Sequence, residues 1–94
     1  MRSTAVVPTQ HAARYMGQLV KHFAHRRPTT LEATHGRVEF EIGVCEVAAG
    51  EVLTLTCIAP AETLAQLQDV VARHLVRFAF RENELQVNWG PSQD

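Results

Sequence analysis

The sequence has little net charge and no long run of apolar residues. Its 94 residues have a formal net charge of −1, so no overall positive field favours binding to nucleic acid or to an anionic membrane. No apolar segment approaches the ~20 residues that cross a bilayer. The segment of residues 1–7, which Pro8 follows, is too short for the apolar part of a signal peptide. We therefore expect a protein that binds neither nucleic acid nor membrane and has no targeting segment.

Cysteine is also scarce. The only two, Cys45 and Cys57, lie on neighbouring segments that have strand patterns. If Val47 pairs with Val52 across the intervening turn, Cys45 faces Thr54 rather than Cys57. We therefore predict no disulfide between the two thiols. Free thiols are typical of a reducing compartment, so we expect a cytoplasmic location.

Common catalytic motifs are missing as well. The sequence has no glycine-rich loop of the kind that binds phosphate. Cys45 with His22 or His74 would supply a nucleophile and a base, but no third acid and no glycine-rich oxyanion loop is suggested near it. A buried free cysteine behaves chiefly as a small hydrophobic side chain. We therefore predict that the protein is not an enzyme and has no cofactor.

What remains is the composition of one ordinary globular domain. Apolar residues make up 46% of the chain and charged residues 20%, which is usual for such domains. A chain of this length can build one core and is too short for two. We expect a single domain over residues 1–94, with a polar tail from about residue 90.

Apolar residues at helical spacing predict two helices. The first extends from Gln10 to about Arg26, and Pro28 prevents its continuation. The second begins at Pro60, and its apolar face continues to Phe78.

Alternating apolar and polar residues predict the strands, which cover residues 3–7, 29–34, 38–47, 53–57 and 85–89. In the segment 38–47, Gly43 interrupts the alternation, and a β-bulge at Gly43 and Val44 would return Cys45 and Val47 to the core face. The element order is then β-α-β-β-β-α-β. This order predicts an α+β fold, a two-layer sandwich with both helices on one face of a mainly antiparallel sheet.

One edge of the first helix carries three histidines. His11, His22 and His25 follow one line along that edge, together with Tyr15 and Gln18. Imidazole is a common metal ligand and proton carrier near neutral pH.

His22 and His25 are one turn apart, and Cys45 and His74 have suitable donor atoms to complete a zinc or iron site. Nothing in the spacing shows that the four residues converge. The alternative is that each histidine has an ordinary structural role, with His74 hydrogen-bonded on the apolar face of the second helix.

Basic side chains gather at the ends of both helices. Arg73, Arg77 and Arg81 recur every fourth residue, and Lys21 and Arg26 lie at the end of the first helix. Such a cluster can receive an anionic group or an acidic partner surface. The alternative is that the cations interact with the helix C-termini and cover apolar surface with their stems.

Three segments of the chain resemble one family of small bacterial domains. They are residues 13–25, with Arg14-Tyr15 followed by His22-Phe23-x-His25; residues 43–47; and residues 74–81, His-Leu-Val-Arg-Phe-Ala-Phe-Arg. The resemblance covers nearly the whole chain and is to domain of unknown function 2218. The family's motif residues fall on His22, Phe23, His25, Cys45, His74, Phe78, Phe80 and Arg81. Val20 departs from the pattern, because many relatives have cysteine there.

The resemblance implies a domain with no assigned activity. It also implies a link to siderophore-interacting flavin reductases, to which some similar domains are attached. We therefore expect a non-catalytic interaction or accessory module that serves a protein partner, such as a redox or iron-handling protein, or forms a homodimer. The alternative function is that of a small zinc- or iron-binding domain.

Overall fold

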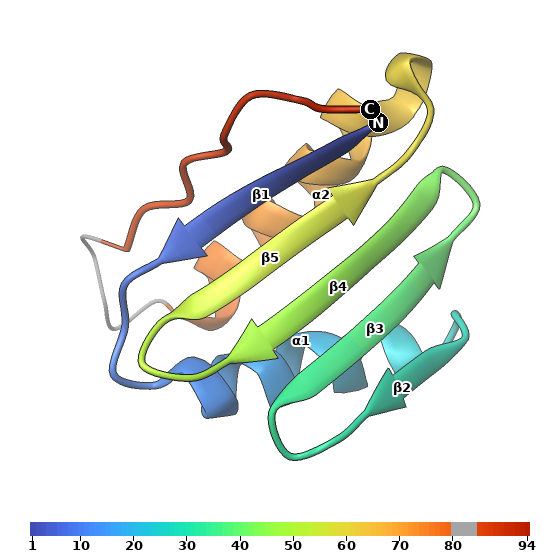
Figure 1. Ribbon diagram of the computed structural model, residues 1–94. Helices are drawn as coiled ribbons and strands as arrows, with labels where there is room; N and C mark the ends of the chain where they lie inside the picture. The colour runs from blue at the N-terminus through green and yellow to red at the C-terminus, as the bar shows by residue number, and fades with distance from the viewer. Residues whose placement is uncertain (80–84) are drawn as a thin grey trace.

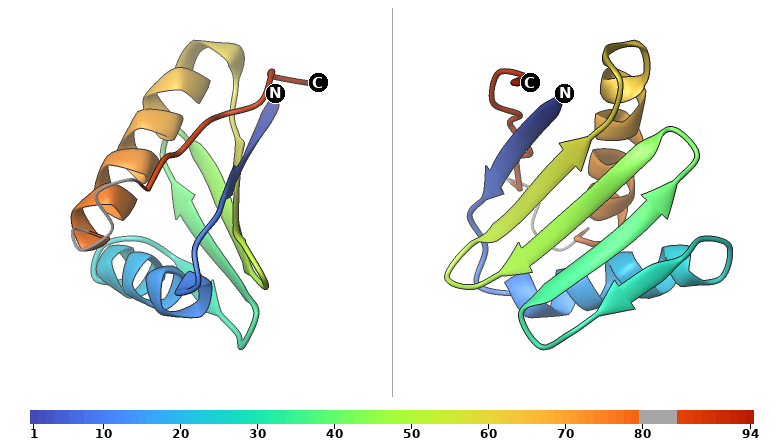
Figure 2. Two further views of the ribbon diagram at one scale, coloured as in Figure 1. Left: turned by 90° about the vertical axis from the view of Figure 1, so that its left-hand side faces the viewer. Right: turned by 45° about the vertical axis from the view of Figure 1, so that its right-hand side comes forward.

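A computed structural model describes residues 1–79 and 85–94. Within these residues a five-stranded antiparallel sheet has the strand order β1-β5-β4-β3-β2. Both helices cover one face of this sheet (Figures 1 and 2), which confirms the predicted two-layer α+β fold. The elements are β1 (Arg2–Val7), α1 (Ala12–Ala24), β2 (Thr29–Leu31), β3 (His35–Phe40), β4 (Gly43–Ala49), β5 (Leu53–Ile58) and α2 (Ala61–Phe78).

Each helix buries one apolar stripe against the sheet. The buried residues of α1 include Tyr15, Met16 and Leu19, and those of α2 include Leu67 and Leu75. Burial of such side chains contributes roughly 1.5–3 kcal/mol each, so the two stripes fix both helices on the sheet. No helix among the described residues is long and apolar enough to cross a membrane.

The first turn of α2 is joined to the turn between β3 and β4. Thr63 Oγ1 donates a hydrogen bond to the carbonyl oxygen of Ile42 over 2.7 Å. This contact fixes the position of that turn relative to the helical layer.

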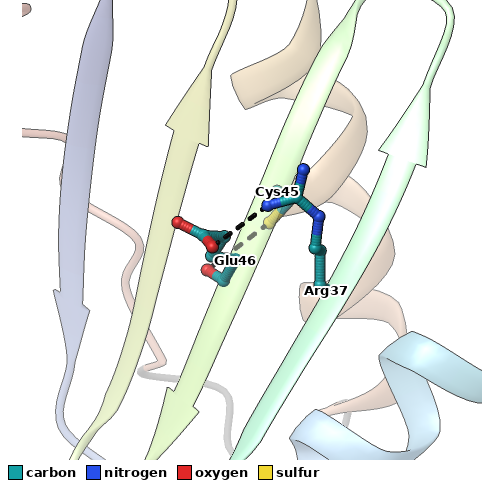
Figure 3. Close-up of polar contacts among 3 residues, drawn as sticks. All are labelled: Arg37, Cys45 and Glu46. Carbon is teal, nitrogen blue, oxygen red and sulfur yellow. Dashed lines mark hydrogen bonds and ion pairs between the residues drawn. The ribbon is translucent and has the colours of Figure 1, made fainter. Parts of the chain in front are cut away.

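The opposite face of the sheet is polar. Arg37 on β3 and Glu46 on β4 form an ion pair over 3.2 Å (Figure 3), and the Thr4 and Thr56 hydroxyls are 3.3 Å apart. Cys45, beside Glu46 in β4, is buried. Alternation along β4 therefore separates a core face from a hydrated face.

The strand predicted over residues 38–47 is in fact two strands. The chain reverses after Phe40, which pairs with Gly43 across a two-residue turn. Gly43 has φ +153°, and a Cβ there would lie 2.5 Å from the Ile58 carbonyl oxygen. The glycine therefore permits a close chain reversal rather than the predicted bulge. The apolar alternation continues through Ile42 in the turn, which is why the sequence pattern conceals the reversal.

The predicted register between the two cysteines is wrong. Val47 pairs with Leu55, and Cys45 pairs directly with Cys57. β4 continues to Ala49, so the turn begins later than the sequence pattern indicates. Both thiols are free.

The strand predicted over residues 85–89 is absent as a regular element among the described residues. Instead, the C-terminal segment follows β1 through isolated bridges, of Ala5 with Trp89 and of Arg2 with Gln93 (Figure 1). Arg2 and Gln93 exchange backbone hydrogen bonds of 2.6 and 2.8 Å. The segment pairs discontinuously because Pro91 has no N–H to donate to a ladder. It nevertheless covers the outer edge of β1.

Candidate functional site

A cavity of about 750 Å³ lies where the end of α1, the middle of α2 and the β3–β4 turn come together. We call it the helix-end cavity. It is open to solvent, and its size is within the range of small-molecule sites. Its lining residues are His22, Phe23, His25, Arg26, Arg27, Phe40, Glu41, Ile42, Gln66, Val70 and His74.

Aromatic rings from three elements meet in its wall. Phe23 of α1 contacts Phe40 of β3 and His74 of α2, with ring centroids 4.9 Å apart in both cases. The His22 ring lies 5.0 Å from that of His74 and 5.4 Å from that of Phe78. These separations are typical of favourable aromatic pairs. The cluster therefore packs the end of α1 against both α2 and the sheet.

His74 is held in one orientation by its own helix. Its Nδ1 lies 2.6 Å from the Val70 carbonyl oxygen. A carbonyl can only accept, so Nδ1 carries the proton in this bond and Nε2 is the remaining polar atom of the ring. Nε2 accepts a hydrogen bond when the ring is neutral and donates one when it is protonated. The bond also gives His74 the structural role that the sequence offered as an alternative.

His22 lies in an electropositive environment. Partial burial and then the neighbouring His74 and Arg77 lower the pKa of His22 below 6.5, with smaller effects from His25 and Arg26. His22 is therefore mainly neutral at pH 7. The pKa is lowered first because burial removes water from the charged form, and then because a proton on His22 would add a further positive charge to a group of basic side chains.

The cations at the cavity are only partly balanced by acids. Arg27 pairs with Glu41 over 3.8 Å, and Glu41 is the one carboxylate among the described lining residues. No ion pair within 4 Å joins Arg26 or Arg77 to another described residue. A smaller cavity of about 200 Å³ beside His74 is lined by Arg73, His74 and Arg77. The two cavities share His74 and extend the basic surface along α2.

The four predicted metal ligands are not brought together. His22, His25 and His74 line the helix-end cavity, but Cys45 is buried in the sheet and is absent from that lining. Within residues 1–79 and 85–94, no group of three or more His, Cys, Asp or Glu side chains is arranged to hold a metal ion.

The residues predicted to follow one edge of the first helix do not all lie at the cavity. His11 contacts Tyr15, whose side chain belongs to the core. Only the C-terminal end of the line, at His22 and His25, reaches the cavity.

The predicted basic cluster is partly assembled. Arg26 lines the helix-end cavity, and Arg73 and Arg77 line its smaller neighbour. Arg73 also pairs with Asp69 one turn earlier over 3.8 Å. Lys21 is exposed on α1 and lines neither cavity. Arg81 and Phe80 lie outside the described residues.

Sequence reasoning missed the residues that the β3–β4 turn and the middle of α2 contribute. The alternation predicts Phe40, Glu41 and Ile42 as consecutive strand residues, and Gln66 and Val70 lie outside the apolar stripe that defines α2. Gly43 was the available signal, because an isolated glycine within a strand pattern often marks a close approach of two backbone segments.

The fold and cavity together define a small α+β domain with an aromatic-walled, basic surface pocket. The chain belongs to a family of uncharacterised proteins conserved in bacteria, domain of unknown function 2218, whose profile matches residues 4–90. It is similar to PA4090 from Pseudomonas aeruginosa, the subject of an NMR structure, with 36% sequence identity and a TM-score of 0.82. The match covers 99% of this chain and 98% of that one. No curated protein matches the chain.

Proposed function

We propose that the chain is a non-catalytic binding module that holds an anionic, planar group in the helix-end cavity. The observation that carries this proposal is the contact of the His22 and His74 rings with Phe23 at a site surrounded by basic side chains. Aromatic and imidazole rings offer flat apolar surfaces for a planar group. Guanidinium groups offer paired donors to a carboxylate. The group is carried by a small molecule or by a partner protein.

The choice of an anion rests on the charges around the cavity. Arg27 is partly neutralised by Glu41, whereas Arg26 and Arg77 both act to lower the pKa of His22. A carboxylate near these residues would reduce their mutual repulsion. It would also accept a hydrogen bond from a protonated His74 Nε2 or from a guanidinium.

The proposed setting is that of an accessory domain in the cytoplasm. We expect a protein partner or a second copy of the chain rather than nucleic acid or membrane. The resemblance to domains attached to siderophore-interacting flavin reductases makes a redox or iron-handling protein the first kind of partner to test.

The alternative function, a zinc or iron site, has less support. His22, His25 and His74 share a cavity, and the Nδ1 bond of His74 to a carbonyl is of the kind that orients metal-bound histidines. However, Cys45 does not line that cavity. Titration with zinc separates the two ideas, because a metal site requires saturable shifts at all three histidines that disappear as imidazole becomes protonated.

The direct test compares two aromatic probes that differ in charge. Benzoate carries a carboxylate, whereas benzamide has nearly the same shape and no net charge. We expect backbone and imidazole NMR signals of His22, Phe23 and His74 to shift saturably with benzoate and only weakly with benzamide. Equal binding of the two probes, or benzoate shifts scattered over the surface, would contradict the proposal.

Variants of two basic residues on α1 supply the matched control. Replacing Arg26 with Ala should weaken benzoate binding by about 10- to 150-fold, since hydrogen bonds to charged groups contribute about 1.5–3 kcal/mol. Replacing Lys21 with Ala removes one charge from the same helix but outside the cavity, and should change affinity less than twofold. If the two variants weaken binding equally, overall charge and not the cavity is responsible.

A further inference from the structure

Cys45 and Cys57 face each other on two adjacent inner strands of the sheet, β4 and β5. They are direct register partners of β4 and β5, which lie side by side in Figure 1, and their exposed fractions are 1% and 0%. Neither residue lines the helix-end cavity, so this pair has no part in the proposed binding function.

The hydrogen bonds of β1 show which way the Cys57 backbone faces. Met1 and Ala59 exchange hydrogen bonds of 2.8 and 2.9 Å. Antiparallel pairs alternate between hydrogen-bonded and non-hydrogen-bonded positions. Two residues along, Ser3 and Cys57 are therefore also a hydrogen-bonded pair. The Cys57 N–H and carbonyl groups point towards β1, away from β4.

The hydrogen bonds between β3 and β4 show which way the Cys45 backbone faces. The Ala49 N–H donates to the Thr34 carbonyl over 2.9 Å, so the Ala49 backbone faces β3. The same alternation turns the Cys45 backbone towards β3. Cys45 and Cys57 therefore form a non-hydrogen-bonded pair, the position at which facing side chains come closest.

This position suits a disulfide. The Cα atoms of a non-hydrogen-bonded pair are about 4.5 Å apart, within the range of about 4.4–6.8 Å that disulfides span. The Cys45 thiol itself donates to the Glu46 carbonyl over 3.9 Å, and the neighbouring Cys57 thiol, and after it burial, raises the pKa of Cys45 well above its ordinary value. Closing the bond requires no change of strand register.

We propose that Cys45 and Cys57 are an oxidative modification site that closes a cross-strand disulfide by exchange with a low-molecular-weight disulfide. One cysteine thiolate attacks the small disulfide and releases one thiolate, which leaves a mixed disulfide on the protein. The second cysteine then attacks the protein-bound sulfur and releases the other thiolate. Two protein thiols are oxidised, one small disulfide is reduced to two thiols, and the two protons pass to these products.

Burial of the two thiols determines how fast the disulfide forms, and the spacing of the paired strands determines how easily it is reduced. The attacking species is the thiolate, and the raised pKa of Cys45 keeps its population small, so the reaction waits for a local opening of the sheet. The Cα separation of about 4.5 Å that is general for such pairs is at the short end of the disulfide range, and strained disulfides are more easily reduced. We therefore expect slow closure that a dithiol reductant reverses.

The test treats the reduced protein with oxidised glutathione, alkylates the remaining thiols and measures the intact mass. We expect a monomer that is lighter by two hydrogen atoms and unalkylated, with residues 45 and 57 joined in its peptide map. Dithiothreitol should restore both thiols, and the oxidised form should have the higher Tm because the cross-link restricts the unfolded chain.

A displaced cysteine supplies the control. The double variant Cys45→Val, Val47→Cys moves one thiol two residues along the same buried face, diagonal to Cys57, where cross-strand neighbours are about 7–8 Å apart. We expect it to remain open or to carry glutathione. Cys45→Ser should stop at the mixed disulfide on Cys57.

Three outcomes would overturn the inference. They are persistence of both native thiols after long incubation, cross-linking only between molecules, and closure of the displaced pair as fast as the native one.

Discussion

Replacing Gly43 with alanine tests how the β3–β4 turn is built. Its added Cβ would lie 2.5 Å from the Ile58 carbonyl oxygen, 2.6 Å from the Ala59 Cβ and 2.9 Å from a methyl group of Leu67. The first two neighbours belong to the backbone or are attached directly to it, so no side-chain rotation relieves the overlap.

The size of the effect follows from two costs. A backbone conformation that only glycine adopts readily costs of order 1–3 kcal/mol for another residue, and overpacking a core costs about 1–3 kcal/mol. We therefore expect Gly43→Ala to lower the free energy of unfolding by about 2–6 kcal/mol. That loss corresponds to a Tm at least about 8 °C lower for a domain of this size.

Two other glycines provide controls in the same assay. Gly50, in the β4–β5 turn, and Gly17, within α1, have no atom within 4 Å of an added Cβ. Gly50→Ala should leave stability within about 0.5 kcal/mol of the original, and Gly17→Ala should raise it by roughly 0.5–1 kcal/mol because alanine favours helix. Urea and thermal unfolding measure all three. A Gly43→Ala variant as stable as Gly50→Ala would refute the close approach.

Three further perturbations test the core, the turn and the cavity. Leu67→Ala, at a fully buried position, should cost about 2–5 kcal/mol in urea unfolding; a loss below 1 kcal/mol would mean that α2 packs elsewhere. Thr63→Val removes the hydrogen bond to Ile42 and should cost about 1 kcal/mol, with no loss if that bond is not formed. The lowered pKa of His22 means that the unfolded chain binds its proton more readily, so stability should fall as the pH drops below about 6.5. His22→Gln should flatten that part of the pH profile, and an unchanged slope would show that another group titrates.

The fold class could be predicted from the sequence because the spacing of apolar residues reflects which face of each helix and strand is buried. Tyr15, Leu19 and Leu67 are all core residues, as their helical spacing indicates, and the alternation along Leu53 and Leu55 places β5 correctly. Local pattern does not specify where a strand reverses, however. At Gly43 the reversal depends on contact with Ile58 and Leu67, which no local window contains.

The candidate site was predictable only in part for the same reason. Residue type alone marks His22 and His74 as chemically capable, and the structure brings their rings together. Donor type alone connects Cys45 with these histidines, but its register pairs it with Cys57. Phe40 and Glu41 enter the site through the turn, so their role depends on the reversal that the sequence pattern conceals.

The bridge between Arg2 and Gln93 has a consequence for rearranging this chain. Because the two ends of the sequence lie side by side (Figures 1 and 2), a short linker can join them without crossing the sheet. New ends can then be opened at the exposed Gly50 and Glu51 turn. In such a circular permutant Arg2 and Gln93 belong to one continuous hairpin, and β4 and β5 no longer follow one another along the chain. The same proximity allows the domain to be inserted into a surface loop of another protein with little separation of the loop ends.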